Sequence, residues 1–90
     1  MNVTHDERNA RFVLEHEGTR SMVQYRMRDD NIMHLIRTWV APEFRGGGFG
    51  VLLVREALDY ARAHDLEVTT SCWFVDEFLE RTPEYQDLRA

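Results

Sequence analysis

Lysine is absent from this 90-residue chain, cysteine occurs once and proline only twice. All eleven basic residues are arginine, against sixteen acidic ones, so the formal charge is −5. Proteins that attract nucleic acid or anionic membranes through a general positive field have the opposite charge. The composition therefore predicts neither nucleic acid nor a membrane as a partner.

The lone cysteine, Cys72, has no second thiol for an internal disulfide or a CxxC zinc site. No spacing of His, Asp or Glu resembles a metal site either. The first ten residues lack the apolar segment of a secretory signal, and no apolar run reaches the roughly 20 residues of a membrane span. We therefore expect a cytoplasmic protein that holds no metal.

What is present indicates a folded chain, since 43% of the residues are hydrophobic and the length suits a single domain over 1–90. The polar residues 1–9 are expected to form a loose terminus. Alternation of apolar and polar residues predicts three strands, at 11–16, 21–27 and 32–40, joined by polar turns.

The third predicted strand, 32–40, has apolar residues on both of its faces. Strict alternation puts His34 and Thr38 on one face and Arg37 and Trp39 on the other. We therefore expect a central strand that is covered on both sides. In this setting His34 is more typical of a packed histidine than of a catalyst.

Apolar residues at helical spacing predict a helix from about Gly48 to His64, then a strand at 66–71 and a short helix at 76–81. Residues 72–75 suit either kind of element. A strand, a helix and a further strand imply a parallel crossover, whereas the earlier hairpins imply antiparallel pairing. The predicted fold class is α+β: a twisted mixed sheet with a main helix after a glycine-rich loop and a short C-terminal helix.

Four of the five glycines lie in the hexapeptide Arg45–Gly50, between the third strand and the main helix. Glycines there let backbone N–H groups converge, and the helix N-terminus adds unpaired amides that suit a phosphate. A purely structural turn remains the alternative. A P-loop is excluded because Lys and Ser or Thr do not follow the last glycine, and a GxGxxG fingerprint fails at Val51 or Leu53.

The spacing Arg45-x-x-Gly48-x-Gly50 resembles the acyl-CoA pyrophosphate loop of the GNAT acetyltransferase superfamily. With Cys72 in "TSCWFV" and the terminal "RTPEY", residues 11–88 are similar to its small single-domain branch, of the YjdJ and N-acetyltransferase-domain-containing 1 type. The resemblance implies acetyl-CoA as cosubstrate, with pantetheine along the third strand and pyrophosphate on the loop. The cofactor-binding residues that it implies are Thr38, Trp39, Val40, Arg45, Gly46, Gly47, Gly48, Phe49 and Gly50.

The candidate catalytic residues are Cys72 and Arg37. Cys72 matches a cysteine of that branch, and the resemblance implies that its thiolate attacks the acetyl thioester. A buried, inert thiol is the alternative, since free cysteine is among the most buried residue types. Arg37 stands where family members often carry His, and it cannot act as a base at neutral pH. It could favour the thiolate electrostatically, hold an anionic group of the substrate, or form a structural ion pair.

The leading prediction is an acetyl-CoA-dependent N-acetyltransferase that acts on an amine of an unknown small molecule or protein. A CoA- or acyl-CoA-binding module with little turnover is the alternative, favoured by the missing His, and a protein-interaction domain is a third possibility. Glu43 is a candidate water-linked base. Four aromatic residues are candidates for the acyl pocket or for core packing: Trp39, Phe49, Trp73 and Phe74. The short chain leaves the acceptor side open, in a monomer or a weak homodimer.

Overall fold

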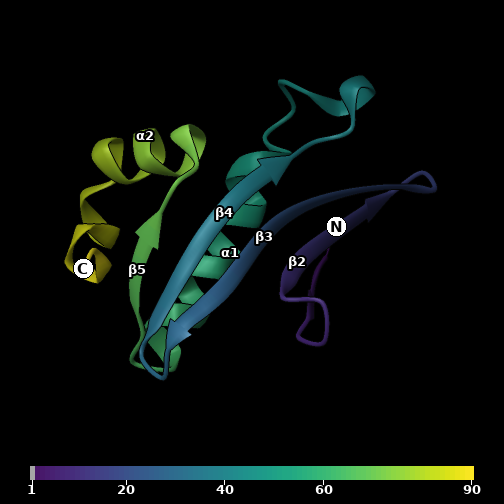
Figure 1. The fold of residues 1–90 in the computed structure, drawn as a ribbon. Helices are drawn as coiled ribbons and strands as arrows, with labels where there is room; N and C mark the ends of the chain where they lie inside the picture. Colours follow the sequence, from purple (N-terminus) through teal and green to yellow (C-terminus); the bar gives the residue numbers. More distant parts are fainter. Residues whose placement is uncertain (1) are drawn as a thin grey trace.

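The computed structural model describes residues 2–90, which form a five-stranded mixed sheet with helices packed against it (Figure 1). The strands are β1 (Val3–Asp6), β2 (Arg11–His16), β3 (Thr19–Asp29), β4 (Ile32–Trp39) and β5 (Glu67–Thr70). The helices are α1 (Phe49–Ala63) and α2 (Trp73–Arg81), with 3-10 segments η1 (Pro42–Phe44) and η2 (Pro83–Leu88). The predicted α+β class is confirmed.

The strands lie in the sheet in the order of the chain. The first four pair antiparallel, and β5 then joins β4 in parallel after the α1 crossover. Pairing of β4 with β5 runs from Ile32 opposite Glu67 to Leu35 opposite Thr70. Residues 36–39 of β4 extend beyond this pairing, so the two parallel strands part before β4 ends.

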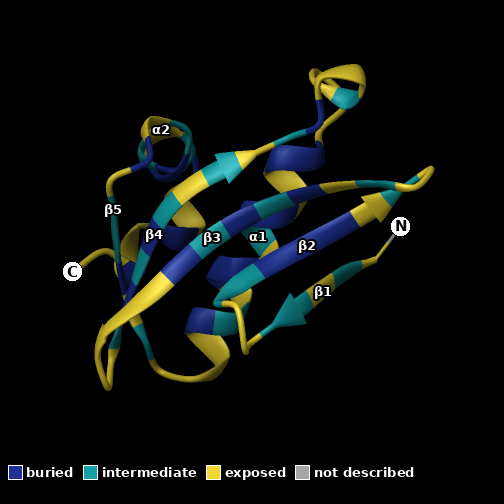
Figure 2. Ribbon diagram, turned by 45° about the vertical axis from the view of Figure 1, so that its right-hand side comes forward, coloured by how far each residue is buried: buried dark blue, intermediate teal, exposed yellow. Residues whose placement is uncertain are grey.

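The helices α1 and α2 and the segment η2 pack on one face of the sheet, which we call the helix face. The ribbon of Figure 2 is dark blue where residues of the strands and of α1 are buried. The fully buried side chains of this core include Leu14, Val23, Leu35, Leu53 and Leu58. Each such side chain contributes about 1.5–3 kcal/mol by leaving water. The opposite side, which we call the open face, exposes 44% of Trp39.

A β-bulge interrupts β4 at Ile36. Across the β3–β4 pair Arg37 lies opposite Gln24, but Leu35 lies opposite Tyr25, which leaves Ile36 without a partner. One extra residue in a strand exchanges the faces of every residue beyond it. The two halves of β4 therefore follow different alternations.

The bulge corrects the faces expected from strict alternation. Thr38 lies on the helix face, where the Cys72 sulfur is 3.7 Å from its hydroxyl oxygen. Arg37 and Trp39 are exposed on the open face, on the same side as His34. The expectation that β4 is covered on both sides was therefore wrong, because its open face keeps these polar and aromatic groups in solvent.

Residues 1–9 were expected to be loose, but Val3–Asp6 pairs with β2 as the edge strand β1, while residue 1 lies outside the described part of the chain. His5 anchors this strand. Its ring stacks on Phe12 with 4.1 Å between centroids, and its Nε2 lies 2.6 Å from the Tyr25 hydroxyl oxygen. A polar sequence concealed this anchor because a half-buried imidazole, rather than an aliphatic side chain, packs against the core.

The other elements follow the sequence pattern within a few residues. The main helix starts one residue later than expected and ends one earlier, whereas α2 starts at Trp73 because Cys72 already serves as its N-cap. The tail is fixed by Tyr85, whose hydroxyl donates to the Asp59 carboxylate at 2.7 Å. Within residues 2–90, every helix is too short or too polar to cross a lipid bilayer.

Candidate functional site

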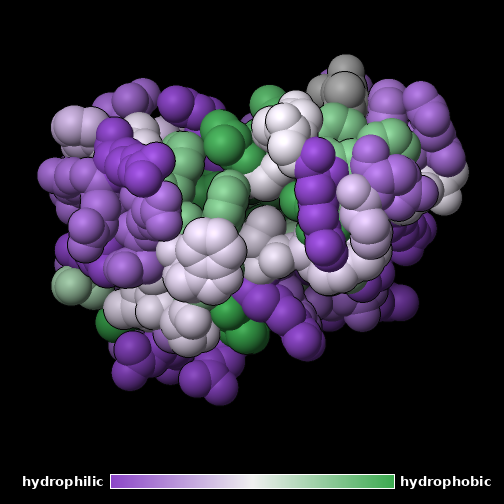
Figure 3. Space-filling view, turned by 90° about the horizontal axis from the view of Figure 1, so that it is seen from above, coloured by the Kyte–Doolittle hydropathy of each residue, from purple (hydrophilic) through white to green (hydrophobic). Residues whose placement is uncertain are grey.

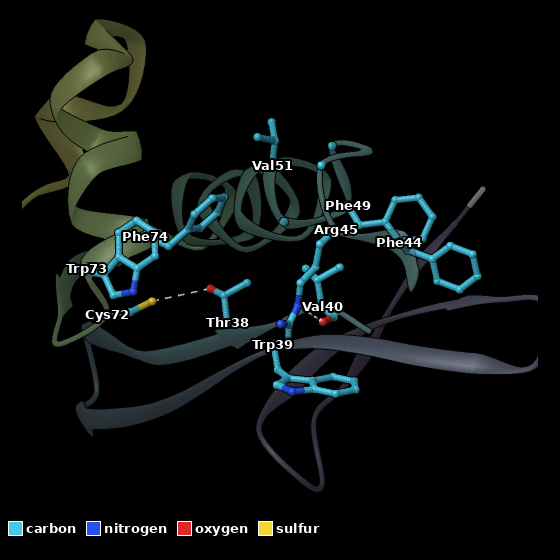
Figure 4. A pocket seen from close by; sticks show the side chains of 13 residues that line it. Thr38, Trp39, Val40, Phe44, Arg45, Phe49, Val51, Cys72, Trp73 and Phe74 are labelled. Carbon is cyan, nitrogen blue, oxygen red and sulfur yellow. Dashed lines mark hydrogen bonds between the residues drawn. The ribbon is translucent and has the colours of Figure 1, made fainter. Parts of the chain in front are cut away.

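A pocket of about 560 Å³ opens where β4 ends and α2 begins (Figure 4). Seen from that end of the molecule, apolar side chains gather in a hollow between polar lobes (Figure 3). The lining includes nine of the eleven residues predicted for the site: Thr38, Trp39, Val40, Arg45, Gly46, Gly48, Phe49, Gly50 and Cys72. Two distant parts of the sequence, the glycine-rich loop and the cysteine, therefore meet in one cavity.

The loop presents unpaired backbone amides at the start of α1. Gly48 is the N-cap, with a φ of 88° that suits glycine and few other residues. The amides of Phe49, Gly50 and Val51 meet no acceptor among residues 2–90, and the first α-helical bond runs from Leu52 to the Gly48 carbonyl at 3.1 Å. Three free N–H groups at the positive end of a fifteen-residue helix can bind an anion.

Two amides of the loop are already used. The N–H of Arg45 bonds to the Pro42 carbonyl at 3.4 Å, and the N–H of Gly47 bonds to the Phe44 carbonyl at 3.3 Å. Gly47 also lies outside the pocket, in a neighbouring hollow that includes Glu43. Of the loop predicted to bind an anion, only the later part and the first turn of α1 therefore keep free backbone N–H groups.

Gly50 is required by packing as well as by the loop. A Cβ at this position would lie 2.9 Å from the tip of the Phe74 ring, closer than side chains normally approach. Phe74 comes from the first turn of α2, so this contact joins the starts of the two helices. The absence of a side chain at Gly50 leaves room for the Phe74 ring, and both residues line the pocket.

Cys72 lies at the inner end of the pocket and is 8% exposed. Its backbone N–H donates to the Thr70 hydroxyl at 2.9 Å, and its thiol points at the Thr38 hydroxyl (Figure 4). As the N-cap of α2 it sits at the positive end of a helix. Among residues 2–90, Arg45 is the only other ionisable side chain in the lining.

Arg45 marks the mouth of the pocket. Its Nε donates to the carbonyl of Val40 at 2.8 Å, which holds the exposed guanidinium across the end of β4 (Figure 4). The guanidinium is bonded through Nε alone in this contact, so its terminal nitrogens remain available to a ligand. Arg45 and the α1 amides thus supply positive potential at the same cavity.

Arg37, the second predicted catalytic residue, is not brought to Cys72. Its Nε donates to the Gln24 side-chain oxygen at 2.9 Å on the open face. His34 is also outside the pocket, between the hydroxyls of Thr69 and Ser71 at 2.7 and 3.2 Å. Burial, with a further contribution from nearby arginines, lowers the pKa of His34.

Sequence reasoning missed two residues of the lining, Phe44 and Val51. Phe44 stacks on Phe49 at 5.3 Å between centroids and closes the pocket beside the loop. Val51 is part of the apolar stripe of α1, yet it lies in the first turn and is 37% exposed. An apolar residue at a helix start that faces away from the core was the signal available in the sequence.

Comparisons with known proteins agree with this geometry. Residues 11–88 match the family described as GCN5-related N-acetyl-transferase. Protein NATD1 of Bos taurus is 29% identical over 85 residues, which cover 92% of this chain and 75% of the relative, and that of Homo sapiens is 28% identical with the same coverage. The solution structure of a GCN5-like putative N-acetyltransferase from Staphylococcus aureus is 27% identical, with a TM-score of 0.79 over 99% of this chain and 87% of that one. The chain therefore belongs to the GCN5-related N-acetyltransferase family.

Proposed function

We propose that this protein is an acetyl-CoA-dependent N-acetyltransferase that takes the acetyl group onto Cys72 and passes it to an amine. One observation carries the proposal: a single pocket joins the free amides at the start of α1 to the thiol at the start of α2. An anion site and a nucleophile in one cavity suit a long thioester with a phosphorylated end.

The cosubstrate would lie along the part of β4 that β5 leaves unpaired. Its pyrophosphate would accept hydrogen bonds from the amides of residues 49–51 and from the Arg45 guanidinium. Its pantetheine arm would run past Thr38 and Val40 toward Cys72, with the acyl end against Trp73 and Phe74. This assignment uses both the polar mouth and the apolar inner wall of the pocket.

The transfer would occur in two steps. The Cys72 thiolate attacks the carbonyl carbon of the thioester, so that a new sulfur–carbon bond forms and CoA leaves as a thiolate that takes up a proton. The free amine then attacks the acetyl-cysteine, the nitrogen–carbon bond forms, the Cys72 thiolate leaves and the amine loses a proton to solvent. The Thr38 hydroxyl, 3.7 Å from the sulfur, orients the nucleophile.

Intact mass after incubation with acetyl-CoA tests this route directly. Because the chain has no lysine, an added acetyl group has few sites other than Cys72 and the N-terminus. We expect one acetyl group on the wild type and none on Cys72→Ala, with Thr38→Val slowing its appearance. Acetylation that persists in Cys72→Ala would exclude the acyl-cysteine.

A CoA-binding module with little turnover is the second candidate, and the pocket lining itself favours it. No His, Asp or Glu belongs to that lining within the described part of the chain, so a base for direct transfer to an amine is missing there. Calorimetry with CoA, followed by an assay of CoA release, distinguishes the two functions. Binding without acetylation of Cys72 and without release of CoA would favour the module.

A further inference from the structure

A second groove, of about 420 Å³, lies on the open face of the sheet beside β4. It is lined by Arg11, Met22, Gln24, Arg37 and Trp39. These residues come from three neighbouring strands, and the bulge in β4 is the reason that the last two are on this face. The groove is thus a product of the same irregularity that brings Thr38 to Cys72.

The charge of this groove is opposite to that of the chain. Within the described part of the chain, two guanidinium groups and no carboxylate line it, although the protein as a whole carries −5. Arg11 is neutralised by Asp6, with 3.2 Å between Nε and the carboxylate oxygen. Arg37 bonds only to the amide oxygen of Gln24, and no carboxylate of residues 2–90 lies within 4.0 Å of it. An exposed guanidinium of this kind is suited to a carboxylate ligand.

The groove is adjacent to the thioester pocket. Trp39 lines both cavities, with its indole turned away from the pocket and toward the open face (Figure 4). Arg37 immediately precedes Thr38, whose hydroxyl is 3.7 Å from the Cys72 sulfur on the other side of the strand. A ligand held at Arg37 is therefore separated from the Cys72 thiol by the width of β4. At this point β4 is no longer paired with β5.

We infer that the groove is the acceptor site and that the acceptor is a primary amine carrying a carboxylate, separated from it by an aliphatic spacer. The carboxylate binds Arg37, the spacer lies along Trp39, and the amine reaches the acetyl group at Cys72. Arg37 and Cys72 are on opposite sides of β4. An amine on the same carbon as the carboxylate would therefore stay beside Arg37 and would not reach the acetyl group at Cys72. The inference rests on the proposed transferase function.

The test compares two acceptors of equal length, 6-aminohexanoate and hexylamine. We expect kcat/KM to be about three to ten times higher for the carboxylate, the range for a solvent-exposed charge-assisted bond. Arg37→Gln should abolish this preference. Arg28→Gln, which removes an equal charge from the exposed C-terminal end of β3, should keep it. Two peptides with free N-termini, identical except that one carries Asp where the other carries Asn, extend the test to peptides. A higher kcat/KM for the Asp peptide would assign the carboxylate to a peptide, and equal values would assign it to a free amino acid.

Fluorescence separates the inference from the proposed function. In Trp73→Phe, Trp39 is the only remaining indole, and hexanoate should change its emission unless Arg37→Gln is also present. Equal kcat/KM for the two acceptors would overturn the inference and leave acetyl transfer intact. Binding of hexanoate with no transfer to either amine would instead contradict the transferase and leave the anion groove. Equal kcat/KM for the two acceptors, together with no change in Trp39 emission on addition of hexanoate, would overturn the inference itself.

Discussion

The two faces of the sheet present opposite surfaces to their surroundings. On the helix face, apolar side chains of β2, β3 and β4 are buried under α1, and the pocket opens only where β5 has turned away into α2. On the open face, the same strands expose arginines, a histidine and Trp39. If the proposed functions hold, the cosubstrate binds on one side of β4 and the acceptor on the other.

Truncation of one side chain on each face should give the largest difference, measured as the loss in the free energy of unfolding. Leu14→Ala removes a fully buried side chain from the helix face and should lower the free energy of unfolding by about 2–5 kcal/mol. Met22→Ala, on the open face, should cost about 1 kcal/mol or less because the side chain is partly solvated. Urea unfolding measures both values, and equal losses would contradict the division into two faces.

Gly50→Ala should disturb the pocket through Phe74. Alanine is normally the better residue in a helix by about 1 kcal/mol, but here its Cβ would meet the Phe74 ring at 2.9 Å. We expect a net loss of about 1–3 kcal/mol in stability, together with weaker CoA binding. In a Phe74→Leu background the same change should become neutral or stabilising, and failure of that rescue would exclude the ring as the cause.

Replacement of an arginine at the pocket mouth and of one on the open face should change the affinity for CoA to different extents. Arg45→Gln removes the charge at the pocket mouth and should weaken CoA binding about fivefold, in keeping with an exposed ion pair. Arg37→Gln removes the same charge from the open face and should leave the Kd within about twofold. Calorimetry at two salt concentrations measures both, and an equal effect of the two changes would indicate a general field rather than a local contact.

The smallest expected effect is on the pH dependence of stability. Burial lowers the pKa of His5 on the helix face and of His34 on the open face below the unfolded value of 6.5. The unfolded chain then binds protons more readily than the folded one, so stability is complete above about pH 6.5 and falls as the pH drops below it. His5→Gln and His34→Gln should each flatten this decline between about pH 7 and pH 5. Urea midpoints across that range test it, and unchanged slopes would show that neither histidine contributes.

The sequence by itself determined the elements whose signal is local. The alternation at 11–16, the apolar stripe after Gly48, and the placement of glycines between a strand and a helix each depend on neighbours a few residues apart. For the same reason Cys72 could be assigned to the end of the last strand. The α+β class and most of the pocket lining follow from these patterns together with the family resemblance.

The tertiary structure decided which face of β4 each side chain occupies and whether the N-terminus is ordered. The bulge at Ile36 depends on how β3 and β4 pair along their length, and the order of β1 depends on His5 finding Phe12 and Tyr25 in the core. Neither is encoded in a periodic pattern, because a single unpaired residue or one half-buried imidazole leaves the local alternation almost unchanged. The energy that selects them comes from contacts between strands. Strict alternation therefore separated His34 from Arg37 and Trp39, although the pairing puts all three on the open face.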